Sequence, residues 1–233
     1  MWAGIGMRSM PRPARSQQAA ADYPVRLHVE RATGERNKMT IGFRWILAIP
    51  HLILVGGPGF WAAGFAFGFG RDQWWSGWGS DGLLGVAAGA CAFIAWFAIL
   101  FTSKHPRGLF DLCNFYMRWR VKAVAYTALF RDEYPPFGDG EYPVSIEIPF
   151  PEGERNKRSV GLRFFYAIPH LIIVAFLSLA WAVTGIIAWF ALLFTGKYPE
   201  GLYNFGLGVM RWSVRVEAYM LLMTDVYPPF SLE

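Results

Sequence analysis

The sequence predicts a mainly α-helical, polytopic membrane protein built as a tandem duplication. Three observations predict this fold class. Apolar residues make up 54% of the chain and charged residues only 17%, against about 45–50% and about 25% in ordinary soluble domains. Long uncharged stretches alternate with basic segments, as membrane spans and their flanking regions do. Several motifs also occur twice in the same order.

The duplication rests on two alignments that need no gap. Residues 23–52 match residues 142–171 at an offset of 119 (142 minus 23), and both contain GERNK and AIPHL. Residues 96–137 match residues 189–230 at an offset of 93 (189 minus 96), and both end in YPPF. We therefore expect repeat 1 at 23–137, a linker at 138–141, repeat 2 at 142–230 and a tail at 231–233.

The chain begins with a basic segment, and each repeat begins with an alternating one. Residues 1–22 contain several arginines and prolines but no apolar core, so we expect a flexible basic arm. The segments YPVRLHVE and YPVSIEIPF alternate β-branched and polar residues, which is typical of short strands. Such strands can pair with each other and tie the two repeats together.

The two GERNK segments predict turns that precede helices. Gly34 and Gly153 are expected to take a positive φ angle, and Asn37 and Asn156 are expected to form a turn or a helix cap. Neither segment has the GxxxxGK pattern of a phosphate-binding loop.

Membrane helices are expected at about 41–69 and 82–103, because a hydrocarbon core of about 30 Å needs about 20 helical residues. Repeat 2 carries one apolar stretch at 160–196, too long for one ordinary span. We expect it to form a hairpin of two short helices that turns between Ser178 and Ala182, with the helices at 160–177 and 182–196. A shallow re-entrant pair is the competing geometry.

Charge placement predicts the orientation in the membrane. Basic residues are concentrated before and between the apolar segments, so the positive-inside rule places both termini on the cytoplasmic side of the membrane. An even number of crossings per repeat predicts parallel repeats with a symmetry axis along the membrane normal. The loop at 70–82 then lies outside, where Trp74, Trp75 and Trp78 are candidate contacts for a membrane-protein partner.

A third helix is expected in each repeat, at about 108–130 and 201–224. These segments combine aromatic residues with the basic pairs Arg118 and Lys122, and Arg211 and Arg215. A basic, aromatic-rich helix is typical of the membrane interface. We therefore expect the four basic side chains to contact anionic lipid headgroups.

Arg44 and Arg163 each lie seven residues before the histidine of an AIPH motif, which is about two helical turns. We expect both arginines to anchor their helices by extending to the headgroups. A specific anionic-lipid pocket formed with Lys38 and Lys157 is the alternative interpretation.

His51 and His170 follow prolines inside apolar segments. A proline leaves a helix carbonyl without a partner, and the adjacent histidine can supply a hydrogen bond. The alternatives are a paired imidazole site for a metal, haem or proton, and a contact with lipid. No acidic residue lies within either membrane segment to complete a metal site or proton relay.

Other functional classes receive no support from the sequence. The basic residues flank apolar segments rather than forming one soluble face, so we expect no nucleic-acid binding. Cys91 and Cys113 lack metal-ligand spacing, and their expected role is packing. No GxSxG or HExxH motif is present, so no catalytic residue, metal or cofactor is expected.

Taken together, the YPV, AIPH, FTGKYP, RW and YPPF motifs resemble an uncharacterised bacterial membrane family of unknown function, frequent in actinobacteria and often carrying this unit in tandem. The resemblance implies a membrane-embedded architecture and brings no catalytic residues. The leading hypothesis is a non-enzymatic accessory or scaffold subunit of a membrane complex that binds lipid and a protein partner. The alternatives are a small channel or transporter component, and a histidine-based metal, haem or lipid-modifying enzyme.

Overall fold

The computed structural model describes residues 19–20, 22–32, 36–57 and 82–233. Their elements are β1 (Arg26–Val29), α2 (Lys38–Val55), α5 (Gly82–Thr102), α6 (Arg107–Thr127), β2 (Val144–Glu147), α7 (Lys157–Gly161), α8 (Arg163–Thr195) and α9 (Glu200–Met220). The protein is mainly helical, as predicted. Three helices, α2, α5 and α8, are long and apolar enough to cross a membrane.

The predicted asparagine caps are confirmed. The side-chain oxygen of Asn37 accepts two backbone N–H groups in the first turn of α2, at 3.1 and 3.4 Å. Asn156 does the same in α7, at 3.1 and 3.3 Å. Gly153 has the expected positive φ, 85°, whereas Gly34 lies outside the described residues.

The long apolar stretch of the second half forms one helix instead of the predicted hairpin. α8 continues for 33 residues, about 50 Å at 1.5 Å per residue. The predicted turn at 178–182 is wrong because that segment contains no Gly, Pro or Asn to end a helix. Trp181 in this segment is buried, and its indole lies against Gly206 of α9, where an added Cβ would approach Nε1 to 2.4 Å. This packing holds the middle of α8 in place.

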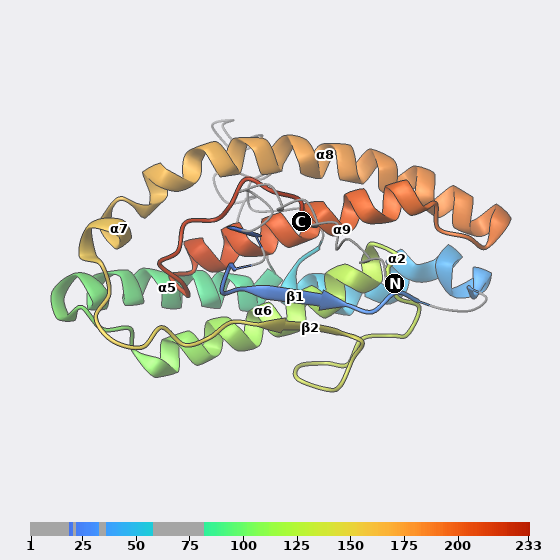
Figure 1. Ribbon diagram of the computed structural model, residues 1–233. Coiled ribbons are helices and arrows are strands. Elements are labelled where there is room, and N and C mark those ends of the chain that lie inside the picture. Colours follow the sequence, from blue (N-terminus) through green and yellow to red (C-terminus); the bar gives the residue numbers. More distant parts are fainter. Residues whose placement is uncertain (1–18, 21, 33–35, 58–81) are drawn as a thin grey trace, which may run out of the picture.

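In the first half, α2 and α5 lie end to end and together occupy the length that α8 occupies in the second half (Figure 1). The helix predicted to reach Phe69 ends at Val55. A Cβ on Gly82, which has a φ of 70°, would lie 2.5 Å from the backbone nitrogen of Gly56. Only glycine allows this close approach of the two helix ends. The alignment offsets pair α2 and α5 with 157–174 and 175–195, the range of α7 and α8.

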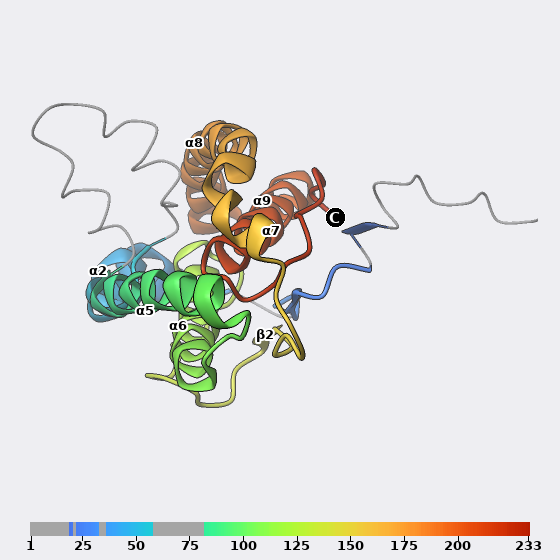
Figure 2. The same ribbon diagram turned by 90° about the vertical axis from the view of Figure 1, so that its left-hand side faces the viewer.

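The first layer of the fold consists of α8 and the α2–α5 line, which run side by side in opposite directions (Figure 1, Figure 2). The indole nitrogen of Trp96, in α5, donates to the carbonyl of Val160, in α7, at 3.0 Å. Trp189, near the end of α8, donates to the carbonyl of Ile41, near the start of α2, also at 3.0 Å. Trp96 aligns with Trp189, and Ile41 aligns with Val160. Each half therefore donates one indole hydrogen bond to the same position in the other half.

The second layer consists of α6 and α9, which cover the inner side of the first layer (Figure 2). They are joined by a buried ion pair in which Arg120 Nε lies 3.2 Å from Glu217 Oε1, and both side chains are only 2% exposed. The two helices lie where the sequence predicted helices. Their aromatic residues Trp119 and Trp212 are buried inside the protein rather than on its surface. The reason is that both halves use these helices as their shared core.

The predicted strands and their pairing are confirmed. β1 and β2 form an antiparallel two-stranded sheet with Leu27 opposite Ile146. Ile146 and Val144 are buried against the second layer. The sheet therefore forms a third layer on the side opposite the first, and its exposed residues are Arg26, His28, Ser145 and Glu147.

The outer surface of the first layer is apolar from end to end, and we call it the outer apolar face. No charged residue occurs in 45–55, 82–102 or 164–195. Exposed side chains recur every three or four residues along α8, which gives one continuous stripe. They include Phe164, Ile168, Ile172, Phe176, Leu179, Val183, Ile186, Phe190 and Phe194 on α8, and Phe43, Ile46, Ile53, Val86, Phe93, Phe97 and Phe101 on α2 and α5.

Candidate functional site

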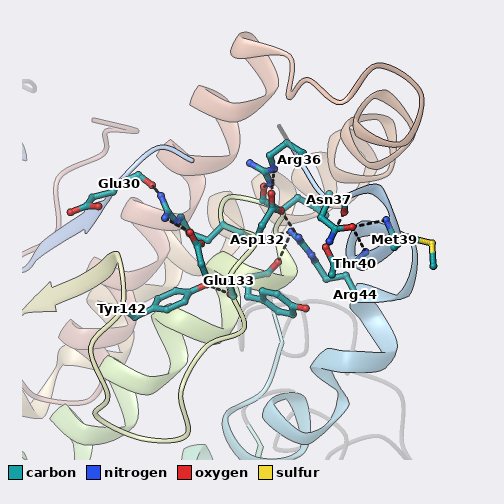
Figure 3. A network of polar contacts seen from close by, with 12 residues as sticks. Glu30, Arg36, Asn37, Met39, Thr40, Arg44, Asp132, Glu133 and Tyr142 are labelled. Atoms are coloured by element: carbon teal, nitrogen blue, oxygen red, sulfur yellow. Dashed lines mark hydrogen bonds and ion pairs between the residues drawn. The ribbon is translucent and has the colours of Figure 1, made fainter. Parts of the chain in front are cut away.

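Each half contains one cluster in which two arginines share an aspartate, which we call an Arg–Asp cluster. In the first, Arg36 Nε and Arg44 Nη2 lie 2.6 and 2.5 Å from the carboxylate oxygens of Asp132 (Figure 3). Arg44 has no exposed surface and also donates to the carbonyl of Arg131 at 2.9 Å. The prediction that Arg44 reaches lipid headgroups is therefore wrong, because protein groups enclose its guanidinium.

The second Arg–Asp cluster repeats this arrangement. Arg155 and Arg163 each place a guanidinium nitrogen 2.6 Å from Asp225, and their side chains are 2% and 3% exposed. The headgroup prediction is wrong for Arg163 for the same reason. Lys38 and Lys157 do not join these clusters. Both are exposed and donate to main-chain carbonyls at the far ends of α8 and α5, at 3.4 and 3.5 Å.

The Arg–Asp clusters hold the ends of α6 and α9. Arg36 donates to the carbonyl of Leu129 at 2.5 Å, and Arg155 donates to that of Leu222 at 2.9 Å. Both leucines have a positive φ, 67° and 64°, which is uncommon outside glycine and typical of a chain leaving a helix. The arginines thus bind carbonyls of the chain just after each helix ends. The aspartates neutralise the arginines.

The second cluster keeps its carboxylate ionised. Burial alone would raise the pKa of Asp225, but the hydrogen bonds and positive charges of Arg155 and Arg163 outweigh burial and lower this pKa. An ionised aspartate beside two buried guanidinium groups is suited to structural cohesion rather than to general acid–base chemistry.

The two AIPH histidines each lie in an aromatic cluster built from the other repeated motifs. Trp119 Nε1 donates to His51 Nδ1 at 3.0 Å. Phe137 stacks on the imidazole with ring centroids 4.4 Å apart, and the centroid of Tyr134 lies 5.0 Å away. The AIPH, RW and YPPF motifs of the first half therefore meet at one place.

The second aromatic cluster has the same composition and geometry. Trp212 Nε1 donates to His170 Nδ1 at 3.0 Å, and the centroids of Phe230 and Tyr227 lie 4.0 and 4.8 Å from that of the imidazole. Because Nδ1 accepts a hydrogen bond in both clusters, each neutral imidazole carries its own proton at Nε2. Both Nε2 atoms are buried, and that of His170 makes no hydrogen bond within the described residues.

This arrangement does not favour the paired imidazole site. Each histidine is stacked on a phenylalanine of its own half. In the part of the chain that the structure describes, no group of three or more His, Cys, Asp or Glu side chains could hold a metal ion.

Some of the basic residues of α6 and α9 that were predicted to contact headgroups bind protein groups instead. Lys122 is 6% exposed and Arg215 is 7% exposed. Lys122 donates to two loop carbonyls, and Arg118 forms an ion pair with Asp139. Lys122 and Arg215 are therefore poorly placed for headgroups. Trp74, Trp75 and Trp78 lie outside the described residues.

Two stretches of the chain, 80–138 and 157–231, match the model of a domain of unknown function, DUF4389, and together they make up more than half of the chain. The chain belongs to the DUF4389 family. No curated protein and no solved structure matches it. Membership agrees with the resemblance to an uncharacterised family.

The DUF4389 stretches contain most of the clusters just described. The match at 157–231 includes Arg163, His170 and the second YPPF motif. The match at 80–138 includes α5, α6, Asp132 and the first YPPF motif but not β1 or α2. The ends of the two matches, 138 and 231, differ by the second alignment offset.

Sequence reasoning missed the aspartates of this DUF4389 protein and two of their arginine partners. Asp132 and Asp225 each stand two residues before a YPPF motif, and Arg36 and Arg155 are the arginines of the GERNK motifs. The signal was present, since the same charged residues recur at equivalent places in both halves. The pairing partners are 62 to 96 positions apart along the chain, so spacing alone did not connect them.

Proposed function

We propose that this DUF4389 protein is a non-enzymatic scaffold of a bacterial inner membrane that lies flat in one leaflet and binds a membrane-protein partner. The observation that carries the proposal is the outer apolar face. It covers the full length of α8 and of the α2–α5 line, while the layer directly behind it carries buried and exposed charges.

The length of the outer apolar face favours a flat position. Exposed apolar side chains on α8 extend from Phe164 to Phe194, about 45 Å along the helix. The hydrocarbon core is about 30 Å thick, so a crossing helix would need a tilt of about 50° to cover this stripe, against an average of about 20°. A helix in the plane of the membrane buries the whole stripe.

The second and third layers also oppose a crossing. Near the middle of α6, the side chains of Arg118 and Asp139 are 42% and 40% exposed. The two-stranded sheet runs beside this region, and in the part of the chain that the structure describes both of its edges are open (Figure 1). A crossing would carry these groups to the depth of the hydrocarbon, where exposed charges and open sheet edges are costly. A flat position leaves them in water.

Exposed basic residues at both ends of the first layer fit the same arrangement. Lys38 and Lys197 lie at one end, and Lys104, Lys157 and Arg158 at the other. In a flat protein both groups meet the anionic headgroups of one leaflet. In a crossing protein they would lie on opposite sides, against the positive-inside rule. We assign headgroup contact to these residues in place of Arg44 and Arg163.

We also infer that the halves are copies related by a two-fold axis. Leu27 pairs with Ile146, the residue 119 positions further on, and the indole bonds of Trp96 and Trp189 are exchanged between the halves. Such reciprocal contacts are typical of two-fold symmetry. An axis through the antiparallel pair is perpendicular to the sheet and to the outer apolar face, so it coincides with the membrane normal.

Depth measurements in lipid vesicles test the flat position. Single cysteines replace Phe164, Leu179 or Phe194 in a chain with Cys91→Ala and Cys113→Ala, and each carries a fluorophore that is quenched by nitroxide lipids of known depth. Equal, shallow depths at all three sites are expected. A central site deeper than both ends contradicts the flat position.

Sidedness provides an independent readout. Lys157→Cys and Lys197→Cys mark opposite ends of the α7–α8 segment. Both should react with a membrane-impermeant thiol reagent from the same side of sealed vesicles, whereas a crossing helix exposes only one of them.

The scaffold role has a separate test. Purification from native inner membranes should recover one partner in a fixed ratio. Recovery of a solitary monomer contradicts the scaffold role, whatever the depth measurements show.

A further inference from the structure

The first half contains one ion pair, between Arg118 of α6 and Asp139, that has no equivalent among the described residues of the second half. In the first half, Arg118 Nε donates to Asp139 at 2.9 Å. One turn further along α6, Lys122 Nζ donates to the carbonyls of Gly138 and Gly140 at 3.2 and 2.6 Å. A short loop thus supplies both a carboxylate and carbonyl groups to two cations.

The equivalent cations in the second half are Arg211 and Arg215, 93 positions further on. Arg215 donates to the main-chain oxygen of Glu233, the equivalent of Gly140. The residue equivalent to Asp139 is Leu232, which has no charge. Within the described residues, Arg211 has no ion-pair partner.

A cavity of about 370 Å³ opens at these cations. Arg26 of β1, Arg211 and Arg215 line it together with Leu27, Val214 and Glu233. Arg215 is 7% exposed, and its Nη1 is buried with no hydrogen-bond partner among the described residues. Burial lowers the pKa of Arg215, and the positive charge of Arg211 lowers it further. Three arginines thus line the cavity with the single carboxylate side chain of Glu233, which leaves an excess of positive charge.

We propose that this cavity binds a small oxyanion, a carboxylate or phosphate group, in the position that the Asp139 side chain takes in the first half. Arginine guanidinium groups bind both anions through charge-assisted hydrogen bonds. The cavity lies beside β1, on the side opposite the outer apolar face. Its occupancy is therefore independent of how the protein meets the membrane.

Titration calorimetry with inorganic phosphate and with succinate tests the site, on full-length protein in phosphatidylcholine nanodiscs at constant ionic strength. Saturable binding of one anion per chain is expected. Arg211→Gln should weaken it at least tenfold, whereas Arg118→Gln, the matched change in the first half, should leave it unchanged. Nanodiscs containing phosphatidylglycerol distinguish a lipid phosphate, which would compete with the soluble anion, from a free one.

Leu232→Asp provides the sharper variant, because it restores the carboxylate of the first half. It should abolish anion binding while raising or preserving the melting temperature, which excludes misfolding as the cause. Absence of binding by wild-type protein in both kinds of nanodisc, or equal affinity in Arg211→Gln, overturns the proposal.

Discussion

Replacing Asp225 with Asn should destabilise the protein far more than an ordinary change to a surface charge. Asp225 is the only carboxylate that faces both Arg155 and Arg163 in the described second cluster, and those side chains are 2% and 3% exposed. Removing one partner of a buried ion pair costs about 3–5 kcal/mol, because the remaining charge stays buried. For a chain of this size, each kcal/mol corresponds to about 2–4 °C, so the melting temperature should fall by about 10 °C.

Asp139→Asn provides the matched control. Asp139 also pairs with an arginine, but both side chains are about 40% exposed, and exposed pairs contribute below about 1 kcal/mol. Thermal unfolding of both variants in the same detergent, followed by circular dichroism, gives the comparison. If Asp225→Asn loses no more stability than Asp139→Asn, the Arg–Asp clusters do not hold the fold together in the way described.

Three further predictions use the same unfolding measurement. The lowered pKa of Asp225 contributes stability above its unfolded pKa of about 3.9, so stability should fall as pH drops below about 4, and less so in Asp225→Asn. Gly206→Ala should cost about 1–3 kcal/mol, because its Cβ would lie 2.4 Å from a tryptophan nitrogen of α8, whereas Gly201→Ala meets nothing within 4 Å and should be neutral or stabilising. Trp212→Phe leaves Nδ1 of buried His170 without its donor and should cost about 1–3 kcal/mol, and a neutral result would contradict the role of the aromatic clusters.

Local patterns in the sequence identified the elements but not the burial of their charges. The alternation of β-branched and polar residues was enough to predict β1 and β2. The asparagine of the GERNK motif, Asn37, was enough to predict the start of α2. Arg44 illustrates the limit. An arginine at the end of an apolar segment has the same local sequence whether it faces headgroups or a carboxylate 88 positions away. Only the assembled fold distinguishes the two.

The continuous α8 shows a second limit. Hydrophobic length predicts how many times a chain can cross a bilayer, but only if the helices stand upright. The stretch at 160–196 was divided into two helices on that assumption. Its actual length follows from α9, which packs along it and needs an unbroken partner.

The meeting of α2 and α5 marks a natural insertion point. The first half carries an added segment at 56–81, while the corresponding junction in the second half, Val174 to Ala175, is continuous helix. Gly56 and Gly82 lie next to each other, so the segment between them does not separate the end of α2 from the start of α5. Evolution can therefore lengthen, exchange or delete this segment without rebuilding the helices on either side of it.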